Sequence, residues 1–346
     1  MMKPEEVNEL LPFLLRRENV ARYEDDVVWI GNRQKYPFEK EFVRCDTVES
    51  VARAIEDMIT QGGGPPIAAM YAMAMAAHQS AHLAANALSA KLHAAADRLI
   101  GTRPTNTSLA RQMEQASRVM EQAIASGQSV EAALIQWIEE SRDCAYERYA
   151  LSADYGASLI DDGDGILTMC FAETAFVLSL ALAQKQGKRI HVFTPETRPY
   201  LQGARLTAPC VHELGIPVEI IGDNMPAYVL SQGKVQKYFT AADLVTLDGH
   251  VVNKVGTFQN AIAAHYHGVP YFVFSWGPDK HKPDRDSIVI EERDPAEMKS
   301  CRGVVTTDAQ IPAYYPAFDI TPPHLVAGII TQHGIISPYD LKRFFS

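Results

Sequence analysis

The sequence predicts an α/β protein, in which a mostly helical N-terminal domain with a small β portion precedes a Rossmann-like, parallel-sheet C-terminal domain. Two patterns predict this class. Long, Ala-rich helical stretches dominate the first 150 residues, and from Gly165 onward short β-branched or aromatic runs alternate with helical stretches. A chain of 346 residues is long enough for about two domains. We place their boundary between residues 1–150 and 151–346.

The N-terminal domain is expected to contain one hairpin and a series of helices. Val27–Ile30 and Glu41–Cys45 form two short strands joined by a polar connection, and Thr47 opens a helix. Gly and Pro in QGGGPPIAAM stop that helix. Further helices are predicted from Ile67 to about Leu99, from Ser108 to about Ser126 and from Ser129 to about Leu159.

The C-terminal domain is expected to be a doubly wound parallel sheet. Its strands are predicted at GILTM, RIHVF, VEIIG, LVTL and YFVF, starting at Gly165, Arg189, Val218, Leu244 and Tyr271. A helix over Ala172–Gln186 follows the first of them. In such sheets, substrates bind at the carboxyl ends of the strands.

Bulk properties narrow the function classes. A net charge of −10 argues against a nucleic-acid partner, and no apolar run reaches the ~18–20 residues of a membrane span. The N-terminus lacks the pattern of a secretory signal. Five cysteines without a CxxC pair, and the absence of HxH and HExxH spacings, indicate a reducing cytoplasm and no metal site. They are Cys45, Cys144, Cys170, Cys210 and Cys301.

Cys170 is the first candidate for a chemical role. The strand from Gly165 to Met169 delivers it to a strand-to-helix turn, where a helix N-terminus favours the thiolate. The alternative is that Cys170 packs as a small buried hydrophobe, which is the common role of a free cysteine. The other four cysteines lack this position and are assigned to packing.

Asp243 is the second candidate. It follows an apolar-aromatic segment, so it is either a turn residue or a general acid/base whose pKa is raised by burial. Asp248 and His250 are rival candidates, although Asp248-Gly249 is a strong turn signal. A thiol and a carboxyl together suit proton transfer, next to a carbonyl or between adjacent carbons of a sugar, and a Cys-His-Asp hydrolase stays open.

Several residues suit an anionic ligand. Gly62, Gly63 and Gly64 precede a helix, where their N–H groups meet an anion unless they serve only as a helix stop and start. Arg103 stands at another helix entrance, where its guanidinium can clamp a phosphate. Lys254 adds a point charge at a helix start, or is a solvated surface lysine.

From roughly Val27 to its end, the chain resembles the methylthioribose-1-phosphate isomerase family, which shares its fold with ribose-1,5-bisphosphate isomerase and the regulatory subunits of translation initiation factor 2B. The matching segments are Thr102–Thr105, Cys170, Thr197–Ala208, Ala242, Asp243, Asn253–Phe258, Glu291–Pro295 and Pro316–Thr331. The resemblance implies a homodimeric aldose–ketose isomerase of a sugar 1-phosphate that uses no cofactor or metal. It implies that Cys170 and Asp243 carry protons, and that phosphate and hydroxyls are held by Arg103, Gln202, Asn253 and Lys254.

Two segments depart from the family pattern. The family usually has Arg-Gly-Ala-Pro where this chain has Gly62-Gly63-Gly64-Pro65, and Asn, a small residue and Gly where it has Phe171, Ala172 and Glu173. We therefore expect 5-methylthioribose 1-phosphate, or a relative such as 5-deoxyribose 1-phosphate, as the substrate. The alternative is a non-catalytic sensor of sugar phosphates or nucleotides, like the regulatory subunits of initiation factor 2B.

Overall fold

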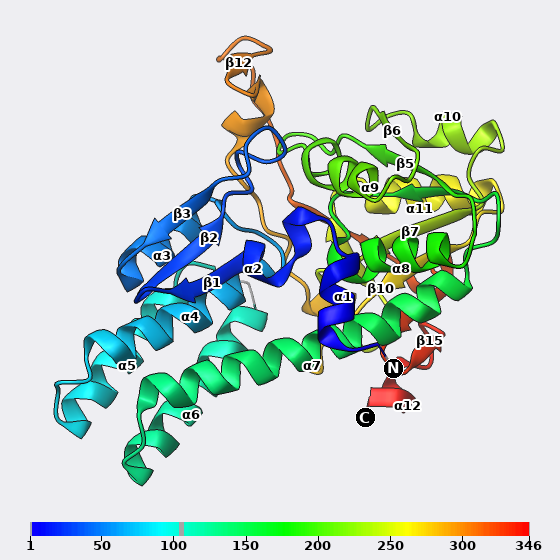
Figure 1. Ribbon diagram of the computed structural model, residues 1–346. Helices are drawn as coiled ribbons and strands as arrows, with labels where there is room; N and C mark the ends of the chain where they lie inside the picture. The colour runs from blue at the N-terminus through cyan, green and yellow to red at the C-terminus, as the bar shows by residue number, and fades with distance from the viewer. Residues whose placement is uncertain (1, 104–106, 346) are drawn as a thin grey trace. The chain divides into compact units, whose positions relative to one another are not determined.

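Figure 1 shows the computed structural model, which describes residues 2–103 and 107–345. Contacts divide the chain into two units. The N-terminal unit is formed by Lys3–Glu9 and Phe13–Glu147, and the C-terminal unit by residues 148–345 with Met2 and Leu10–Pro12. Helix α7 (Val130–Ser158) contributes to both units, as expected for the long helix predicted from Ser129.

The N-terminal unit combines a small antiparallel sheet with helices, as predicted. Its strands are β1 (Ala21–Glu24), β2 (Val27–Gly31) and β3 (Phe42–Cys45), in the order β1-β2-β3. The sequence reasoning missed β1, because ARYE has no apolar run to mark it. The helices and short 3-10 turn are α1 (Pro4–Leu10), η1 (Phe13–Leu15), α2 (Arg17–Val20), α3 (Val48–Glu56), α4 (Gly64–Gln79), α5 (Ala85–Ile100) and α6 (Thr107–Ser126).

Helix α4 is the centre of this unit's core. It is apolar on all sides, and nearly every residue from Gly64 to Ala77 is buried. Alanine and methionine suit this position, because small and flexible side chains let β1, β2, α5 and α6 pack closely against one helix. Helix α3 begins at Thr47, whose side chain accepts the Ser50 N–H at 3.1 Å in a capping box.

The C-terminal unit is built on a seven-stranded sheet among the described residues, in the order β15-β14-β10-β7-β4-β5-β6. The pairs from β6 to β14 are parallel, and β15 is antiparallel. The chain starts at β4, winds outward to β6, and then crosses back to β7 on the other side of β4. The carboxyl ends of β4 and β7 therefore meet where the winding reverses, which is where open α/β sheets bind ligands. The strands are β4 (Gly165–Thr168), β5 (His191–Pro195), β6 (Val218–Ile221), β7 (Lys237–Ala241), β10 (Tyr271–Phe274), β14 (Gly328–Thr331) and β15 (Gly334–Ile336).

Strand β7 shows why helices cover both faces of this sheet. Successive strand residues point to opposite faces. Phe239 packs near Phe176 of α8, with ring centroids 6.4 Å apart, while the Tyr238 hydroxyl donates to the Thr257 carbonyl of α11 at 3.4 Å. The unit's helical elements are α8 (Glu173–Lys185), η2 (Gly203–Thr207), α9 (Ala208–Glu213), α10 (Pro226–Ser231), α11 (Thr257–Tyr266), η3 (Arg285–Ser287), η4 (Pro295–Lys299), η5 (Pro323–Leu325) and α12 (Leu341–Phe345).

One strand of the predicted parallel sheet was wrong. LVTL does not enter that sheet: its first two residues form β8 (Leu244–Val245) in a separate antiparallel sheet with β9 (Val251–Lys254) and β13 (Phe318–Thr321), in the order β13-β9-β8. The sheet strand is β7, whose Tyr238 and Phe239 fill both faces. Two short apolar runs stand close together here, and periodicity alone did not separate them.

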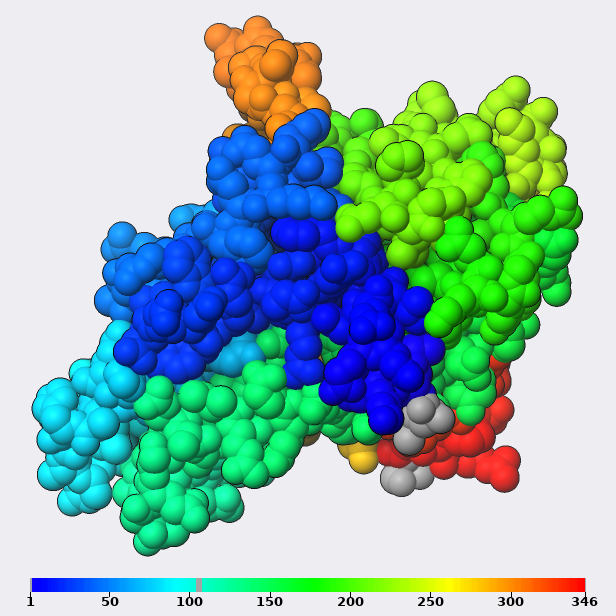
Figure 2. Space-filling model, in the orientation of Figure 1, coloured from blue at the N-terminus to red at the C-terminus, as the bar shows by residue number. Residues whose placement is uncertain are grey.

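A segment after β10 stands apart from the sheet. Residues 294–314 run through η4 and a hairpin of β11 (Ser300–Cys301) and β12 (Val304–Val305), and Figure 2 shows the outer part of this orange segment projecting from the surface. The Arg198 guanidinium of the same unit donates to the Ser300 carbonyl at 3.0 Å. Its ends are tied together, because the Arg293 N–H donates to the Tyr315 carbonyl at 3.0 Å. Separately, among the described residues no helix has both the length and the apolar character needed to cross a lipid bilayer.

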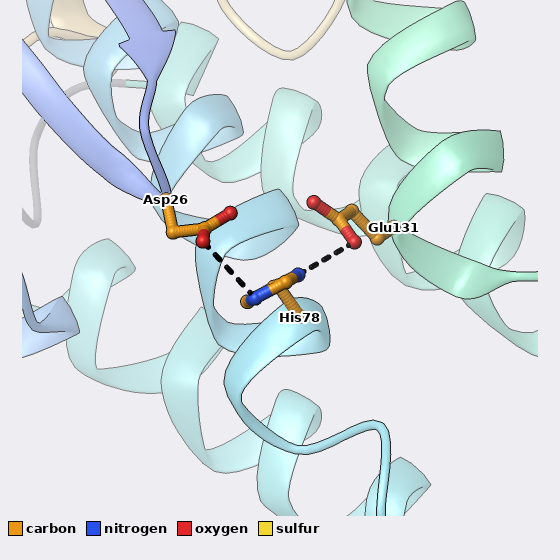
Figure 3. A group of neighbouring side chains, drawn as sticks. All are labelled: Asp26, His78 and Glu131. Atoms are coloured by element: carbon orange, nitrogen blue, oxygen red, sulfur yellow. Dashed lines mark hydrogen bonds and ion pairs between the residues drawn. The ribbon is translucent and has the colours of Figure 1, made fainter.

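A histidine clamp ties together three elements of the N-terminal unit (Figure 3). Nδ1 of His78, at the end of α4, lies 2.9 Å from Glu131 of α7, and Nε2 lies 3.4 Å from Asp26 in the turn after β1. The Tyr23 hydroxyl donates to the other side of Glu131 at 3.0 Å. Opposite ring nitrogens each face a carboxylate, so this group suits a protonated histidine better than a metal ion. The hydrogen bond to Glu131 and both negative charges raise the pKa of His78.

We predict that this clamp stabilises the fold only while His78 is charged. Since its pKa is raised on folding, the stabilisation is complete below the ordinary histidine value of about 6.5 and is lost as pH rises through the folded value. Melting curves of wild type and His78→Gln should therefore differ most at about pH 5–6, where the imidazolium and both carboxylates are charged, and converge at high pH. His82→Gln, at an exposed neighbouring histidine, is the control. A wild-type advantage that does not change with pH would contradict this reading.

Candidate active site

Cys170 lies two residues beyond β4 and three before α8, at the predicted strand-to-helix turn. Its φ of 62° is in the left-handed region, which residues other than glycine seldom adopt. The Thr207 hydroxyl donates to the Cys170 carbonyl and helps to hold this backbone. Glu173, the first residue of α8, has a φ of 56°. Such strained backbone persists where the surrounding structure enforces it, and it gathers at functional sites.

Asp243 stands at the end of the neighbouring strand. It follows β7 by two residues, and its backbone N–H donates to Val252 of β9 at 2.9 Å. In the sheet, Thr168 of β4 pairs with Phe239 of β7. The segments that follow β4 and β7 therefore leave adjacent parallel strands side by side. They carry the Cys170 thiol and the Asp243 carboxyl to the same edge of the sheet, the one at the carboxyl ends of the strands.

The structure corrects the expectation that the helix N-terminus favours a Cys170 thiolate. Burial raises the pKa of the Cys170 thiol to about 11, and the negative charge of Asp243 raises it as well. The positive charge of Lys254 acts in the opposite direction but is outweighed. At neutral pH the group is therefore a protonated thiol, and it can donate a proton before it accepts one.

Asp243 differs from Cys170 in its protonation near neutral pH. Desolvation by the surrounding protein raises its pKa to about 6, opposed by the charges of Lys254 and Arg293 and assisted by those of Glu173 and Glu291. The residue still has solvent-accessible surface, so a ligand can reach it. A carboxyl with this pKa exists in both protonation states near neutrality, which suits general acid and base catalysis.

Lys254 is the last residue of β9, and not a residue of a helix start as predicted; α11 begins three residues later. It is 3% exposed, and Nζ has no hydrogen-bond partner among the described residues. The ammonium lies 5.0 Å from the ring centroid of Phe318 and 5.9 Å from that of Tyr315. Burial lowers its pKa. A buried cation without a hydrogen-bond acceptor is costly unless a ligand supplies one.

Gln202 and Asn253 supply amide groups from two further elements, η2 and β9. Gln202 is 5% exposed, its Oε1 has no hydrogen-bond partner within the described part of the chain, and it caps the π-helical turn η2. Such π turns often occur at functional sites. Gly203 allows this turn, because a Cβ there would lie 1.8 Å from the Pro195 carbonyl oxygen. Asn253 precedes Lys254 on β9 and donates one N–H to the Thr257 hydroxyl at 3.1 Å.

The remaining predicted binding residues belong to the N-terminal unit. The Gly64 N–H donates to the Gln61 carbonyl at 3.0 Å, and Pro65 and Pro66 have no N–H, so residues 64–66 offer no N–H group to an anion at this helix start. A guanidinium nitrogen of Arg103 donates to the Ile55 carbonyl at 3.1 Å. Pro104 and Thr105 of its motif lie outside the described residues. The substrate-binding role of Gly62, Gly63, Gly64 and Arg103 stays a prediction.

The rival candidates form a turn of their own. Nδ1 of His250 lies 2.9 Å from Asp248 Oδ1, and Gly249 between them has a φ of 90°. The hydrogen bonds from Thr246 and His250 outweigh desolvation, so the pKa of Asp248 is lowered. This is the chemistry of a structural turn, with an ionised carboxylate already occupied by its neighbours.

Sequence reasoning gave no role to three residues that contact or influence the candidate site. Arg293 has its guanidinium carbon 5.8 Å from the Phe318 ring, and its Nε donates to Glu291 at 2.8 Å. Tyr315 and Phe318 flank Lys254. Tyr315 and Phe318 lie more than 60 residues after Lys254, and Arg293 lies on a loop without periodicity. Only Arg293 and Phe318 belong to segments shared with the family, and no sequence signal marked Tyr315.

Comparison with known proteins decides the family. The model of the Initiation factor 2 subunit family matches residues 64–338. A methylthioribose-1-phosphate isomerase of Chloroflexus aurantiacus is 38% identical over 330 residues, covering 91% of this chain and 94% of that protein. One from Desulfitobacterium hafniense is 36% identical over 333 residues, covering 92% and 95%. The chain belongs to the methylthioribose-1-phosphate isomerase family.

Solved structures agree. The chain is similar to 5-methylthioribose 1-phosphate isomerase from Pyrococcus horikoshii, with a TM-score of 0.87, 29% identity and coverage of 99% of this chain and 96% of that one. It is also similar to translation initiation factor eIF-2B subunit delta from A. fulgidus, with a TM-score of 0.82, 31% identity and coverage of 93% and 96%. The predicted resemblance is confirmed, and the relatives identify the chain as an isomerase enzyme.

Proposed function

We propose that this isomerase converts a 5-substituted ribose 1-phosphate to the corresponding ribulose 1-phosphate, with 5-methylthioribose 1-phosphate or a close relative such as 5-deoxyribose 1-phosphate as the substrate. The observation that carries the proposal is the pairing of a carboxyl of pKa about 6 with a protonated thiol at the edge of adjacent strands. The names of the curated relatives supply the sugar class.

The reaction must open the ring while the phosphate stays on C1. Asp243, protonated, donates its proton to the ring oxygen as the bond from C1 to that oxygen breaks. The resulting carboxylate then takes the proton from C2, and the electron pair of that bond forms the C1–C2 double bond of an enol. The fact that Asp243 is partly ionised near neutrality lets one group perform both steps in turn.

The enol then becomes the ketose at the thiol. Cys170 donates its proton to C1, and the hydroxyl on C2 returns a proton to the sulfur as its carbonyl forms. Lys254 lies near both groups and stabilises the partial negative charge on sulfur and oxygen. Every proton in this scheme has a donor and an acceptor among the side chains and the sugar, so the scheme requires neither metal nor cofactor.

The finer features of the protein are part of the same proposal. The parallel strands lie in the order β6-β5-β4-β7-β10-β14, the order of two mononucleotide-binding halves, which supports a Rossmann-like C-terminal domain. Domains at 1–150 and 151–346, a homodimer formed through the sheet-bearing unit, and a cytoplasmic location remain predictions.

The substrate is tested by incubating the purified protein with 5-methylthioribose 1-phosphate, 5-deoxyribose 1-phosphate and ribose 1,5-bisphosphate, followed by NMR. We expect conversion of one of the first two to its ketose, and a loss of about 100-fold or more in Cys170→Ser, because a hydroxyl is a much weaker acid than a thiol. Cys210→Ser, at a buried cysteine away from the strand ends, is the control. Folded wild type without turnover of any sugar would favour the sensing function.

The pH profile tests the role of Asp243. If it must be protonated to open the ring, kcat/KM should fall as pH rises above about 6, its pKa in the free protein. The phosphate group of the sugar has a second pKa of about 6 as well. Glu173→Gln separates the two, because the negative charge of Glu173 raises the pKa of Asp243 and its removal should shift only the enzyme's inflection to lower pH. An inflection that does not move would assign it to the substrate.

A further inference from the structure

The buried ammonium of Lys254 has carboxylates nearby but no ion-pair partner, and the proposed reaction does not explain why. Its ammonium is buried without a hydrogen-bond partner among the described residues, although two carboxylates, Asp243 and Glu291, are near enough to raise its pKa. A buried ammonium is ordinarily stabilised by an ion pair with a nearby carboxylate. Another interaction must therefore keep the Glu291 carboxylate from pairing with Lys254.

Arg293 occupies that carboxylate. Its Nε donates to Oε1 of Glu291 at 2.8 Å, and the two side chains are 17% and 31% exposed. The backbone fixes both residues, because the Arg293 N–H donates to Tyr315 at 3.0 Å and the Ala317 N–H donates to Glu291 at 2.8 Å. Residues 291–293 are therefore locked against 315–317, the segment that leads into β13.

Phe318 completes the arrangement. The Lys254 ammonium lies 5.0 Å from its ring centroid, and the Arg293 guanidinium carbon lies 5.8 Å from the same centroid. Two cations thus share one aromatic ring, while Glu291 is hydrogen-bonded to Arg293 and not to Lys254. Arg293 further lowers the pKa of Lys254 by repulsion. The binding of Glu291 by Arg293 leaves the Lys254 ammonium without an acceptor, and the repulsion from Arg293 favours its binding to an anionic oxygen of the substrate.

We propose that Arg293 is a positioning residue of the isomerase: it sequesters Glu291, and so leaves Lys254 unpaired to stabilise the oxygen and sulfur that gain negative charge during proton transfer. The inference rests on the proposed function for its catalytic consequence. The electrostatic part, namely which cation Glu291 neutralises, belongs to the protein alone and can be measured without turnover.

The first test compares the kinetics of one single variant and one double variant with those of wild type. In Arg293→Gln, Glu291 is released and can pair with Lys254, so kcat should fall about 10- to 100-fold with a smaller change in KM. In Glu291→Gln/Arg293→Gln the competing carboxylate is gone as well, and kcat should recover most of that loss. Glu292→Gln, at the exposed residue between them, is the matched control and should behave as wild type.

The second test uses Cys170 as a local probe. The rate of its alkylation by iodoacetamide is followed by peptide mass spectrometry as a function of pH, and the rate reports the fraction of thiolate. Lys254 and Arg293 both lower the pKa of this thiol. Arg293→Gln should therefore slow alkylation at a given pH by about threefold or more, and the double variant should restore part of the rate.

The outcomes separate the two proposals. Recovery of alkylation in the double variant supports the sequestering role even when the tested sugars are not converted, in which case only the proposed function fails. A double variant as slow in both assays as Arg293→Gln would overturn the inference, because Arg293 would then act by direct contact or by holding the loop. A melting temperature near that of wild type in each variant excludes loss of fold as the cause.

Discussion

The structure of the candidate site depends on one buried charge. Lys254 ends a fully buried strand, rests on aromatic rings, and has no hydrogen-bond acceptor for its ammonium among the described residues. An unpaired buried cation destabilises a fold. The arrangement is stable because β9 is held on both sides by β8 and β13, and because the carboxylate of Asp319 anchors the next turn by accepting the N–H groups of Gly256 at 2.7 Å and Phe258 at 3.1 Å. The energy spent on holding this charge becomes available when an anionic oxygen binds.

Desolvation also changes the protonation of the thiol and the carboxyl. Desolvation by the surrounding protein moves the pKa of Cys170 up to about 11 and that of Asp243 up to about 6, so both groups hold protons more firmly than they would in water. Cys170 follows β4 and Asp243 follows the adjacent strand β7, and the hydrogen bond from the Asp243 N–H to Val252 helps to hold the second of them at this edge of the sheet. A structure named as a translation initiation factor subunit shares this fold with a TM-score of 0.82, so the fold alone does not assign a function. The chemistry lies in a few residues at strand ends.

Much of this was predictable from the sequence. The helices from Thr47 onward, four of the five strands predicted from Gly165, and the place of Cys170 follow from periodicity, caps and the rule that sites form at carboxyl strand ends. Asp243 was predicted to precede the strand at Leu244, whereas the structure places it after β7. The pKa of Cys170 was predicted in the wrong direction, because a helix terminus can be read from the sequence whereas desolvation by distant segments cannot. For the same reason LVTL was assigned to the wrong sheet, and Arg293 received no role: both depend on what packs against them in space.

The most direct test of the central claim compares Lys254→Met with wild type. If the buried ammonium is held for function at the expense of stability, the variant should melt at the same temperature or higher, while turnover of the sugar phosphate falls by about 100-fold or more. Lys185→Met, at an exposed lysine on α8, should change neither. A Lys254→Met protein that melts several degrees lower would show that the ammonium is a structural group, and one that keeps wild-type turnover would remove it from the reaction.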